Sequence, residues 1–215
     1  MPVFPDRRYN TLRLLGHDYS STSSLYAVSL VTDQRRPVFA DVKFAKATLK
    51  SLLSDQTLSL LNLRAFCLMP DHLHLLAGVK DPGVDLSTLL GRFESYTTQL
   101  YWKRSQEILA ARQVSLPSSE AERSGVHENR ELITALMDWR ATLRPEVVQL
   151  QKWPNLKPEH FKRKTLWQKK FFDHVIRNQD DLENELDYIL MNPVKEGFVK
   201  YPQFYPYSGI LGGQD

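Results

Sequence analysis

Two apolar runs separated by one short turn constrain the fold of this chain more than any other feature. Residues 61–69 read "LNLRAFCLM", residues 72–79 read "HLHLLAGV", and only Pro70 and Asp71 lie between them. A proline followed by an aspartate is typical of a turn, and two β-rich runs with so short a connection predict an antiparallel hairpin. The hairpin therefore predicts that these two strands are neighbours in an antiparallel sheet.

The flanking segments extend this hairpin to a full domain. We predict strands at 25–31 and 165–176 from their β-rich composition, and amphipathic helices at 42–54, 84–104 and 180–192 from their apolar spacing. The order β-α-β-β-α-β-α predicts an α+β fold, namely a ferredoxin-like antiparallel sheet with one additional C-terminal helix. In that topology the strand at 72–79 lies in the middle, two helices cover one face, and the other face is open.

The C-terminal end carries its own signals. Pro193 should bend or stop the last helix, and Gly197 is placed to cap it. The aromatic tail at 201–209, which contains two prolines, is expected to pack as an ordered coil.

The 215 residues predict one domain, 1–215, with an insertion at about 105–164. The insertion is mostly helical by its pattern, with helices expected at 131–143 and 145–153. Its role is left open by the sequence.

Composition indicates a soluble globular protein, with 42% hydrophobic and 25% charged residues. The apolar runs are too short to span a membrane, and Met1 is followed by proline and charges rather than by a signal peptide. One cysteine, Cys67, excludes an internal disulfide and fits a reducing compartment, where it should lie in the core. We therefore expect a cytoplasmic protein with no membrane partner, no small-molecule cofactor and, as a working expectation, a monomeric state.

The net charge of +3 is unevenly distributed. Between Lys103 and Lys170 there are 14 Lys and Arg against 8 Asp and Glu, while the rest of the chain has 14 against 17. A basic centre in a mildly acidic framework fits a polyanionic partner such as nucleic acid, although such a run is also compatible with a solvated surface.

Two histidines stand out in the second run of the hairpin. Alternation along a strand places His72 and His74 on one face, with Leu73 on the other, so the two imidazoles could share one cation. His-x-His also arises by chance in a chain with six histidines, so structural histidines are the alternative. The pair alone does not decide between them.

A second pair lies on the last predicted helix. Tyr188 and Asn192 are four residues apart and therefore share a helix face, one turn from each other. Asn192 can supply an oxygen ligand, and Tyr188 can reach over a bound ion. The alternative is a helix that packs a tyrosine on the sheet and ends at Asn-Pro.

Several motifs taken together resemble one family. "MPDHLHLL" is followed far downstream by "LWQKKFFDHVIRNQDDLENELDYILMNPVKEGFV", with "RRPVFAD" after the first strand and "YPYSG" near the end. This arrangement resembles the REP-associated tyrosine transposases, a branch of the single-tyrosine HUH transposases. The resemblance covers about 25–104 and 165–208, and the insertion is not part of it.

The resemblance implies an enzyme that cleaves and rejoins single-stranded DNA at hairpin (REP-like) sequences. His72, His74 and Asn192 would hold a divalent metal ion, Mg²⁺ or Mn²⁺, and Tyr188 would attack the phosphate to give a 5′-phosphotyrosine intermediate. The alternatives are a domesticated hairpin DNA or RNA binding protein that does not cut, and a metal hydrolase that uses water.

Basic side chains near the fourth strand and the last helix are the expected phosphate contacts. Trp167 could stack on a base or fill the core, and His174 could support the active site or make a structural hydrogen bond. The expected DNA-binding set is Lys162, Arg163, Lys164, Trp167, Lys169, Lys170, Arg177 and Lys195.

Overall fold

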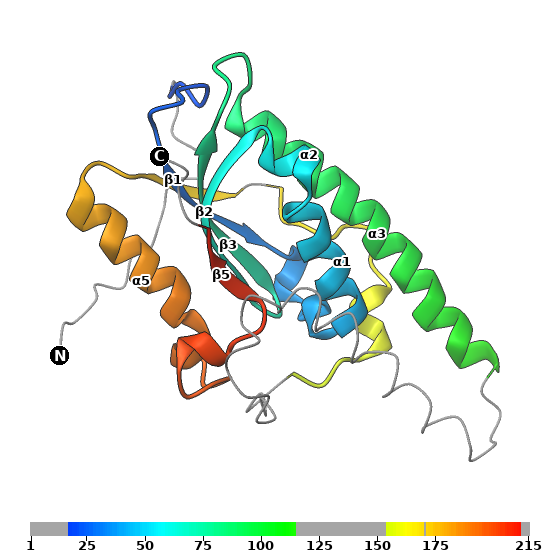
Figure 1. Ribbon diagram of the computed structural model, residues 1–215. Coiled ribbons are helices and arrows are strands. Elements are labelled where there is room, and N and C mark those ends of the chain that lie inside the picture. Colours follow the sequence, from blue (N-terminus) through cyan, green and yellow to red (C-terminus); the bar gives the residue numbers. More distant parts are fainter. Residues whose placement is uncertain (1–16, 115–153, 170, 212–215) are drawn as a thin grey trace.

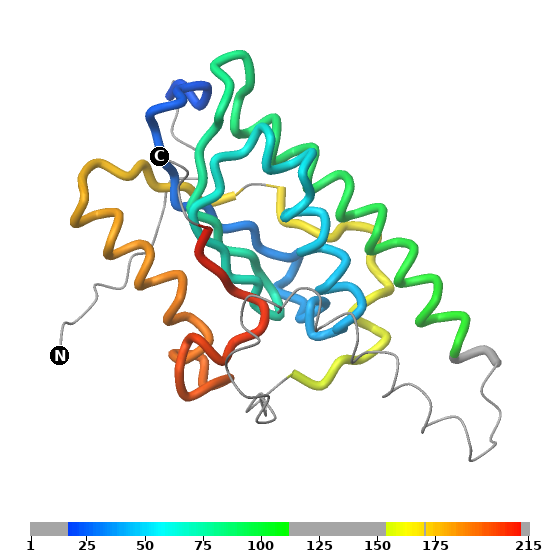
Figure 2. The backbone as a smooth tube through the Cα atoms, in the orientation of Figure 1, coloured from blue at the N-terminus to red at the C-terminus, as the bar shows by residue number. Residues whose placement is uncertain are grey.

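A computed structural model describes residues 17–114, 154–169 and 171–211. Its centre is a five-stranded antiparallel sheet with the strand order β4-β1-β3-β2-β5 (Figures 1 and 2). The strands are β1 (Tyr26–Val31), β2 (Leu61–Leu68), β3 (His72–Val79), β4 (Phe172–Val175) and β5 (Ser208–Ile210). The predicted α+β class is confirmed, and β3 lies in the middle of the sheet as expected. Within the described ranges, no helix is both long and apolar enough to cross a membrane.

The predicted hairpin is formed by β2 and β3. Cys67 pairs with His74 and Leu68 with Leu73, and the Met69 amide donates to the His72 carbonyl at 2.8 Å to close the turn. Since β1 pairs with the other edge of β3, both neighbours of the histidine strand are fixed by backbone hydrogen bonds. The register of His72 and His74 is therefore set by the whole sheet.

Helices α1 (Val42–Leu52), α2 (Asp55–Leu58) and α3 (Leu86–Val114) lie on one side of the sheet (Figure 1). Asp41 caps α1 by accepting from the Phe44 amide at 2.8 Å, and the same carboxylate accepts two hydrogen bonds from Arg104 of α3. This bidentate pair ties the two helices together over a core that includes Leu73 and Leu75 of β3. The predicted helix at 84–104 thus continues ten residues further than the sequence indicated.

Helix α5 (Gln179–Lys195) lies on the opposite side of the sheet (Figure 1). The expectation of an open face was wrong, because α5 packs against β2 and β3 and leaves His74 only 6% exposed. Asn178 begins the helix by accepting from the Asp181 amide at 2.8 Å.

The C-terminal end of α5 differs from the prediction at one residue. The helix does not stop at Pro193 but continues to Lys195. Gly197 adopts a left-handed φ of 72°, and the amides of Gly197 and Phe198 donate to the carbonyls of Val194 and Pro193. This is a Schellman cap, as the glycine predicted.

The predicted strand at 165–176 is mostly not a strand. Only Phe172–Val175 forms β4, beside β1, while Trp167 makes an isolated bridge to Thr32. The Gln168 amide next to that bridge donates to the Val31 carbonyl at 2.8 Å.

The tail was expected to be coil, but Ser208–Ile210 forms β5 at the sheet edge beside β2. Three residues are too few for a pattern to be recognised in the sequence. Gly209 permits the close approach, since a Cβ there would lie 2.9 Å from the Phe66 ring.

The insertion region is described only in part. Residues 105–114 continue α3, and Pro158–Phe161 forms a short 3-10 helix whose Phe161 is buried in the core. The predicted helices at 131–143 and 145–153 lie outside the described residues. The extent of the insertion therefore stays a prediction.

Candidate active site

The two histidines of β3 face α5 and lie next to each other. Their ring centroids are 4.6 Å apart and the rings are nearly perpendicular, at 87°. The His72 side chain is partly exposed, whereas His74 is buried. Strand alternation therefore places the pair together, as the sequence predicted.

Asp71 holds the ring of His72. Its Oδ1 lies 2.5 Å from His72 Nδ1, and its Oδ2 accepts from Arg35 at 3.2 Å. Burial raises the pKa of the Asp71 carboxyl, but hydrogen bonding and charge from His72, together with Arg35, outweigh it, so the pKa lies below its usual value. An ionised Asp71 accepts a hydrogen bond from the Nδ1–H group and leaves Nε2 of His72 as the ligand atom.

Ser29 of β1 holds the ring of His74 in the same way. Its Oγ lies 2.7 Å from His74 Nδ1, while the buried Nε2 has no hydrogen-bond partner in the described part of the chain. Burial lowers the pKa of His74 well below its usual value, and the charges of His72, Arg35 and Lys195 lower it further. A neutral imidazole with an unpaired buried nitrogen is the state that a metal ion requires.

Tyr188 of α5 completes the cluster. Its ring centroid lies 5.5 Å from that of His74, and the side chain remains accessible because the residue is 39% exposed. Burial raises the pKa of the Tyr188 phenol and so does the charge of Glu185, while Asn192 and Arg35 oppose this rise. The Lys195 ammonium lies 4.7 Å from the ring centroid, so this predicted DNA-binding residue also contacts the tyrosine.

Asn192 lies one turn after Tyr188 and is buried. Its Nδ2 donates to the Tyr188 carbonyl at 2.8 Å, which uses the amide nitrogen and leaves Oδ1 for another partner. Two neutral imidazole nitrogens and an amide oxygen are a donor set that suits Mn²⁺ and is compatible with Mg²⁺. The residues present thus fit a divalent ion.

A second group that could hold a metal ion lies further along the same interface. Three side chains each offer one ligand atom, and these atoms lie within 4.8 Å of one another: His174, Asp181 and Glu185. His174 Nε2 already lies 2.8 and 3.0 Å from the two carboxylate oxygens of Asp181. This contact joins β4 to the first turn of α5 and accounts for His174 as a structural residue.

The sequence reasoning did not single out Arg35. Arg35 and Gln34 adopt a left-handed backbone conformation, with φ of 49° and 59° respectively. This conformation costs about 1 kcal/mol or more for each residue that is not glycine. An exposed ion pair such as Arg35–Asp71 contributes about 0–1 kcal/mol and does not offset this cost alone. The signal in the sequence was the "RRPVFAD" motif, which does not reveal that its two arginines point in different directions.

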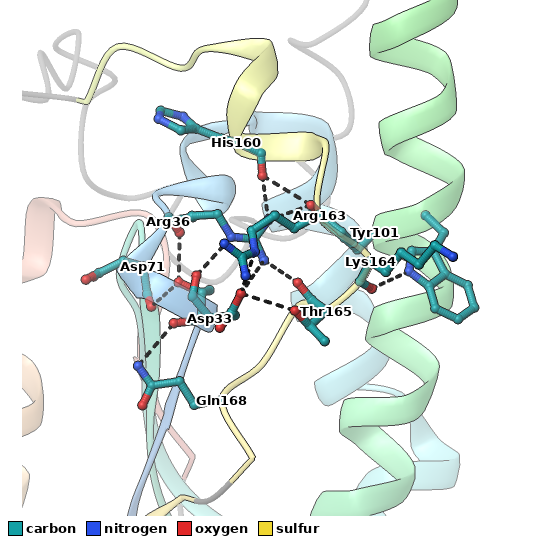
Figure 3. Close-up of polar contacts among 11 residues, drawn as sticks. Asp33, Arg36, Asp71, Tyr101, His160, Arg163, Lys164, Thr165 and Gln168 are labelled. Carbon is teal, nitrogen blue, oxygen red and sulfur yellow. Dashed lines mark hydrogen bonds and ion pairs between the residues drawn. The ribbon is translucent and has the colours of Figure 1, made fainter.

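Arg36, in contrast, is buried and anchors a distant segment (Figure 3). Its guanidinium donates to the Tyr101 hydroxyl and the His160 carbonyl, both at 2.6 Å, and to the Thr165 carbonyl. Trp102 of α3 adds a hydrogen bond to the Lys164 carbonyl at 2.6 Å. Residues 158–165 are therefore fastened at several backbone oxygens.

Thr32 connects this segment to the histidines. Its hydroxyl donates to the Asp71 carbonyl at 2.9 Å and to the Arg36 carbonyl at 2.8 Å. Its backbone bridges to Trp167, so the turn before His72 and the fastened segment share one buried residue. The position of the basic segment relative to the histidine pair is fixed through Thr32 and Arg36.

The predicted DNA-binding residues divide into several groups. Trp167 is buried at 8% exposure and donates to the Thr97 hydroxyl at 2.9 Å, so it belongs to the core and does not stack on bases. Lys162, Lys164, Lys169 and Arg177 are exposed, and Arg163 is exposed while pairing with Asp33 at 3.0 Å. Lys170 lies outside the described residues.

Known proteins are similar to the part of the chain that carries the two histidines. The family model described as "Transposase IS200 like" matches residues 20–115, which include both histidines. A Haemophilus influenzae protein whose name assigns it to the REP-associated tyrosine transposases is 43% identical over 56 residues, 26% of this chain and 32% of that protein. The REP-associated tyrosine transposase of Escherichia coli (strain K12) is 47% identical over 45 residues, 21% of this chain and 27% of that protein. The matched segments thus span about a third of the length of these relatives.

The fold also has a solved counterpart. A REP-associated tyrosine transposase bound to a REP hairpin is similar with a TM-score of 0.50, covering 91% of this chain and 79% of that one, at 16% identity. Identity this low makes the likeness one of fold. The chain is thus similar to the IS200-like transposases over residues 20–115, and over shorter stretches to two proteins named as REP-associated tyrosine transposases.

Proposed function

We propose that the chain is a metal-dependent single-stranded DNA endonuclease and transposase that cleaves and rejoins DNA at hairpin sequences. The observation that carries the proposal is the convergence of His72, His74 and Tyr188 from separate elements, with rings 4.6 and 5.5 Å apart. The solved relative of similar fold was bound to a REP hairpin, which favours a hairpin as the substrate.

Tyr188 is the nucleophile in this proposal. Its phenolic oxygen bonds to phosphorus and the bond from phosphorus to the 3′ oxygen breaks, which leaves a 5′-phosphotyrosine and a 3′-hydroxyl. The phenolic proton passes to solvent, to which Tyr188 is open, and the leaving 3′ oxygen takes up a proton. Attack by another 3′-hydroxyl reverses the step and rejoins the strands without ATP.

His72, His74 and Asn192 would hold the divalent ion. The unpaired Nε2 of His74 and the oriented ring of His72 support this assignment. The bound ion would polarise the phosphate and offset the charge that develops on it. Asp71 and Ser29 keep the two rings in position through their Nδ1 atoms.

The exposed basic residues supply the phosphate contacts that hold the strand. Lys162, Lys164 and Lys169 lie on a segment fastened through Arg36 and Thr32 to the turn before His72. Because this segment is held in place, the strand would be presented to the site in a defined orientation.

A covalent-adduct assay tests the proposal. Labelled single-stranded hairpin DNA is incubated with the chain and Mn²⁺, and the products are separated on a denaturing gel. A protein–DNA band that resists denaturation is expected, and Tyr188→Phe should abolish it while hairpin binding stays within a few-fold. Tyr96→Phe is the matched control, since Tyr96 is an exposed tyrosine on α3.

The same gel separates the alternatives. Binding without a cleaved product would support a non-cutting hairpin binder, and cleavage without an adduct would support hydrolysis by water. Tyr101 is unsuitable as a control because it is buried against Arg36.

A further inference from the structure

We propose that Arg35 is a phosphate-binding residue of this site and contacts a non-bridging oxygen of the DNA strand that Tyr188 attacks. The inference rests on the proposed function and deepens it, because it adds a cationic residue to the catalytic group. It starts from the position of Arg35 beside the residues that orient the histidines.

Arg35 is linked directly to the histidine pair. Its Nη1 lies 3.2 Å from Asp71 Oδ2, and the other oxygen of Asp71 lies 2.5 Å from His72 Nδ1. The Asp71 carboxylate therefore joins the Arg35 guanidinium to the His72 ring, one oxygen to each.

Most of the Arg35 side chain is available to a ligand. The contact with Asp71 uses one terminal nitrogen, and the side chain is 65% exposed. A guanidinium carries five N–H donors in a planar fork that matches the oxygens of a phosphate.

The backbone holds Arg35 in this direction. The consecutive left-handed residues Gln34 and Arg35 form a tight turn in which the Arg35 amide donates to the Thr32 carbonyl at 2.9 Å. As a result Arg36 enters the core while Arg35 points to Asp71 and solvent. The buried contacts of Arg36 compensate for the strain of the turn, so the orientation of Arg35 is preorganised before DNA binds.

The chemistry suits the reaction of Tyr188. The phosphate that the phenol oxygen attacks carries negative charge on its non-bridging oxygens, and this charge grows towards the transition state. A guanidinium that donates to one of these oxygens stabilises that state more than the bound substrate. Arg35 would thus act on the phosphate, while Asp71 restrains both Arg35 and His72.

The test compares variants of Arg35 under single-turnover conditions with saturating protein. Arg35→Gln keeps a polar side chain but removes the charge and the outer part of the guanidinium fork, and it should slow adduct formation at least about tenfold. Arg35→Lys should recover part of the rate, because the charge returns without the planar fork. Arg92→Gln, at an exposed arginine on α3, is the matched control and should leave the rate unchanged.

Neutral methylphosphonates then locate the contact. A methylphosphonate replaces one phosphodiester linkage of the hairpin substrate at a time, at the scissile position and on either side of it. At the linkage that Arg35 contacts, the methylphosphonate should slow the unsubstituted chain but add little to the defect of Arg35→Gln. A purely structural role would give additive losses at every linkage together with a lower melting temperature.

The outcomes distinguish the two proposals. If the unsubstituted chain forms no adduct, the proposed function fails and this inference fails with it. If the unsubstituted chain and Arg35→Gln form adduct at rates within twofold, only the assignment of Arg35 is overturned. Additive losses at every linkage also overturn it, whereas a non-additive loss at one linkage supports it.

Discussion

The ring centroids of His74 in β3 and Tyr188 in α5 are 5.5 Å apart at an interplanar angle of 80°, although more than a hundred residues of chain separate them. The contact is possible because α5 covers the face of the sheet that carries His74. It makes His74 a buried residue as well as a candidate ligand, which affects what its substitution should do.

His72→Ala and His74→Ala should each remove nearly all cleavage, and the double variant should lose little more, because both act on one ion. Mn²⁺ should raise the melting temperature of the unsubstituted chain but not of either variant, since only the intact site binds the ion. Without metal, His74→Ala should also lower the free energy of unfolding by about 1–3 kcal/mol, more than His72→Ala, because His74 is the buried member. Calorimetry with and without Mn²⁺ measures both effects, and a single variant with near-normal cleavage would argue against a shared ion.

Arg36→Met should lower the free energy of unfolding by about 3 kcal/mol, because it leaves the Thr165 carbonyl and the Tyr101 hydroxyl oxygen without their donor and the His160 carbonyl with only the Tyr101 hydroxyl at 3.1 Å. Urea titration measures the loss, and limited proteolysis should show faster cutting at 158–168. Arg92→Met is the control and should change stability by less than about 0.5 kcal/mol. Unchanged proteolysis in Arg36→Met would mean that other contacts hold the segment.

Glu94→Gln should stabilise the protein at pH 8 but not at pH 4.5. Burial raises the pKa of Glu94 from 4.5 to about 7, so the folded state favours the protonated form. The stability that this group contributes is present below pH 4.5 and is lost as the pH rises to about 7, by about 1–3 kcal/mol. The glutamine side chain of the variant cannot ionise and escapes this loss.

Urea titrations of both proteins at the two pH values test this prediction. Subtracting the free energy of unfolding of the unsubstituted chain from that of the variant at each pH cancels the contributions of the other ionisable groups. Asp187→Asn, at an exposed carboxylate on α5, serves as the control. A difference that is the same at both pH values would show that Glu94 does not titrate between them.

Replacing residues 115–153 with a flexible Gly-Ser linker of about 20 residues should leave a folded core, because the five strands and helices α1, α3 and α5 are built from residues outside that segment. The segment holds 5 Lys and Arg against 6 Asp and Glu, whereas residues 154–170 hold 6 against 1. The salt dependence of hairpin binding should therefore be almost unchanged by the deletion. Lys162→Ala combined with Lys164→Ala should instead make it shallower, and fluorescence anisotropy at several salt concentrations measures both.

The parts of the fold that depend on local pattern could be predicted from the sequence. The hairpin at 61–79, the first strand, the helices and the Gly197 cap follow from residue alternation, helical spacing and a left-handed glycine, all of which act over a few residues. The common face of His72 and His74, and that of Tyr188 and Asn192, follow from the same two periodicities.

Contacts between distant segments determine which of these faces meet and how deeply each residue is buried. Three features depend on partners distant in the chain: α5 covers His74, Trp167 enters the core, and Arg35 and Arg36 point in opposite directions. The fifth strand is likewise formed by pairing with β2 rather than by its own three residues. Such contacts have no local signature, because the free energy that fixes them comes from packing and hydrogen bonds between segments that approach each other only in the folded protein.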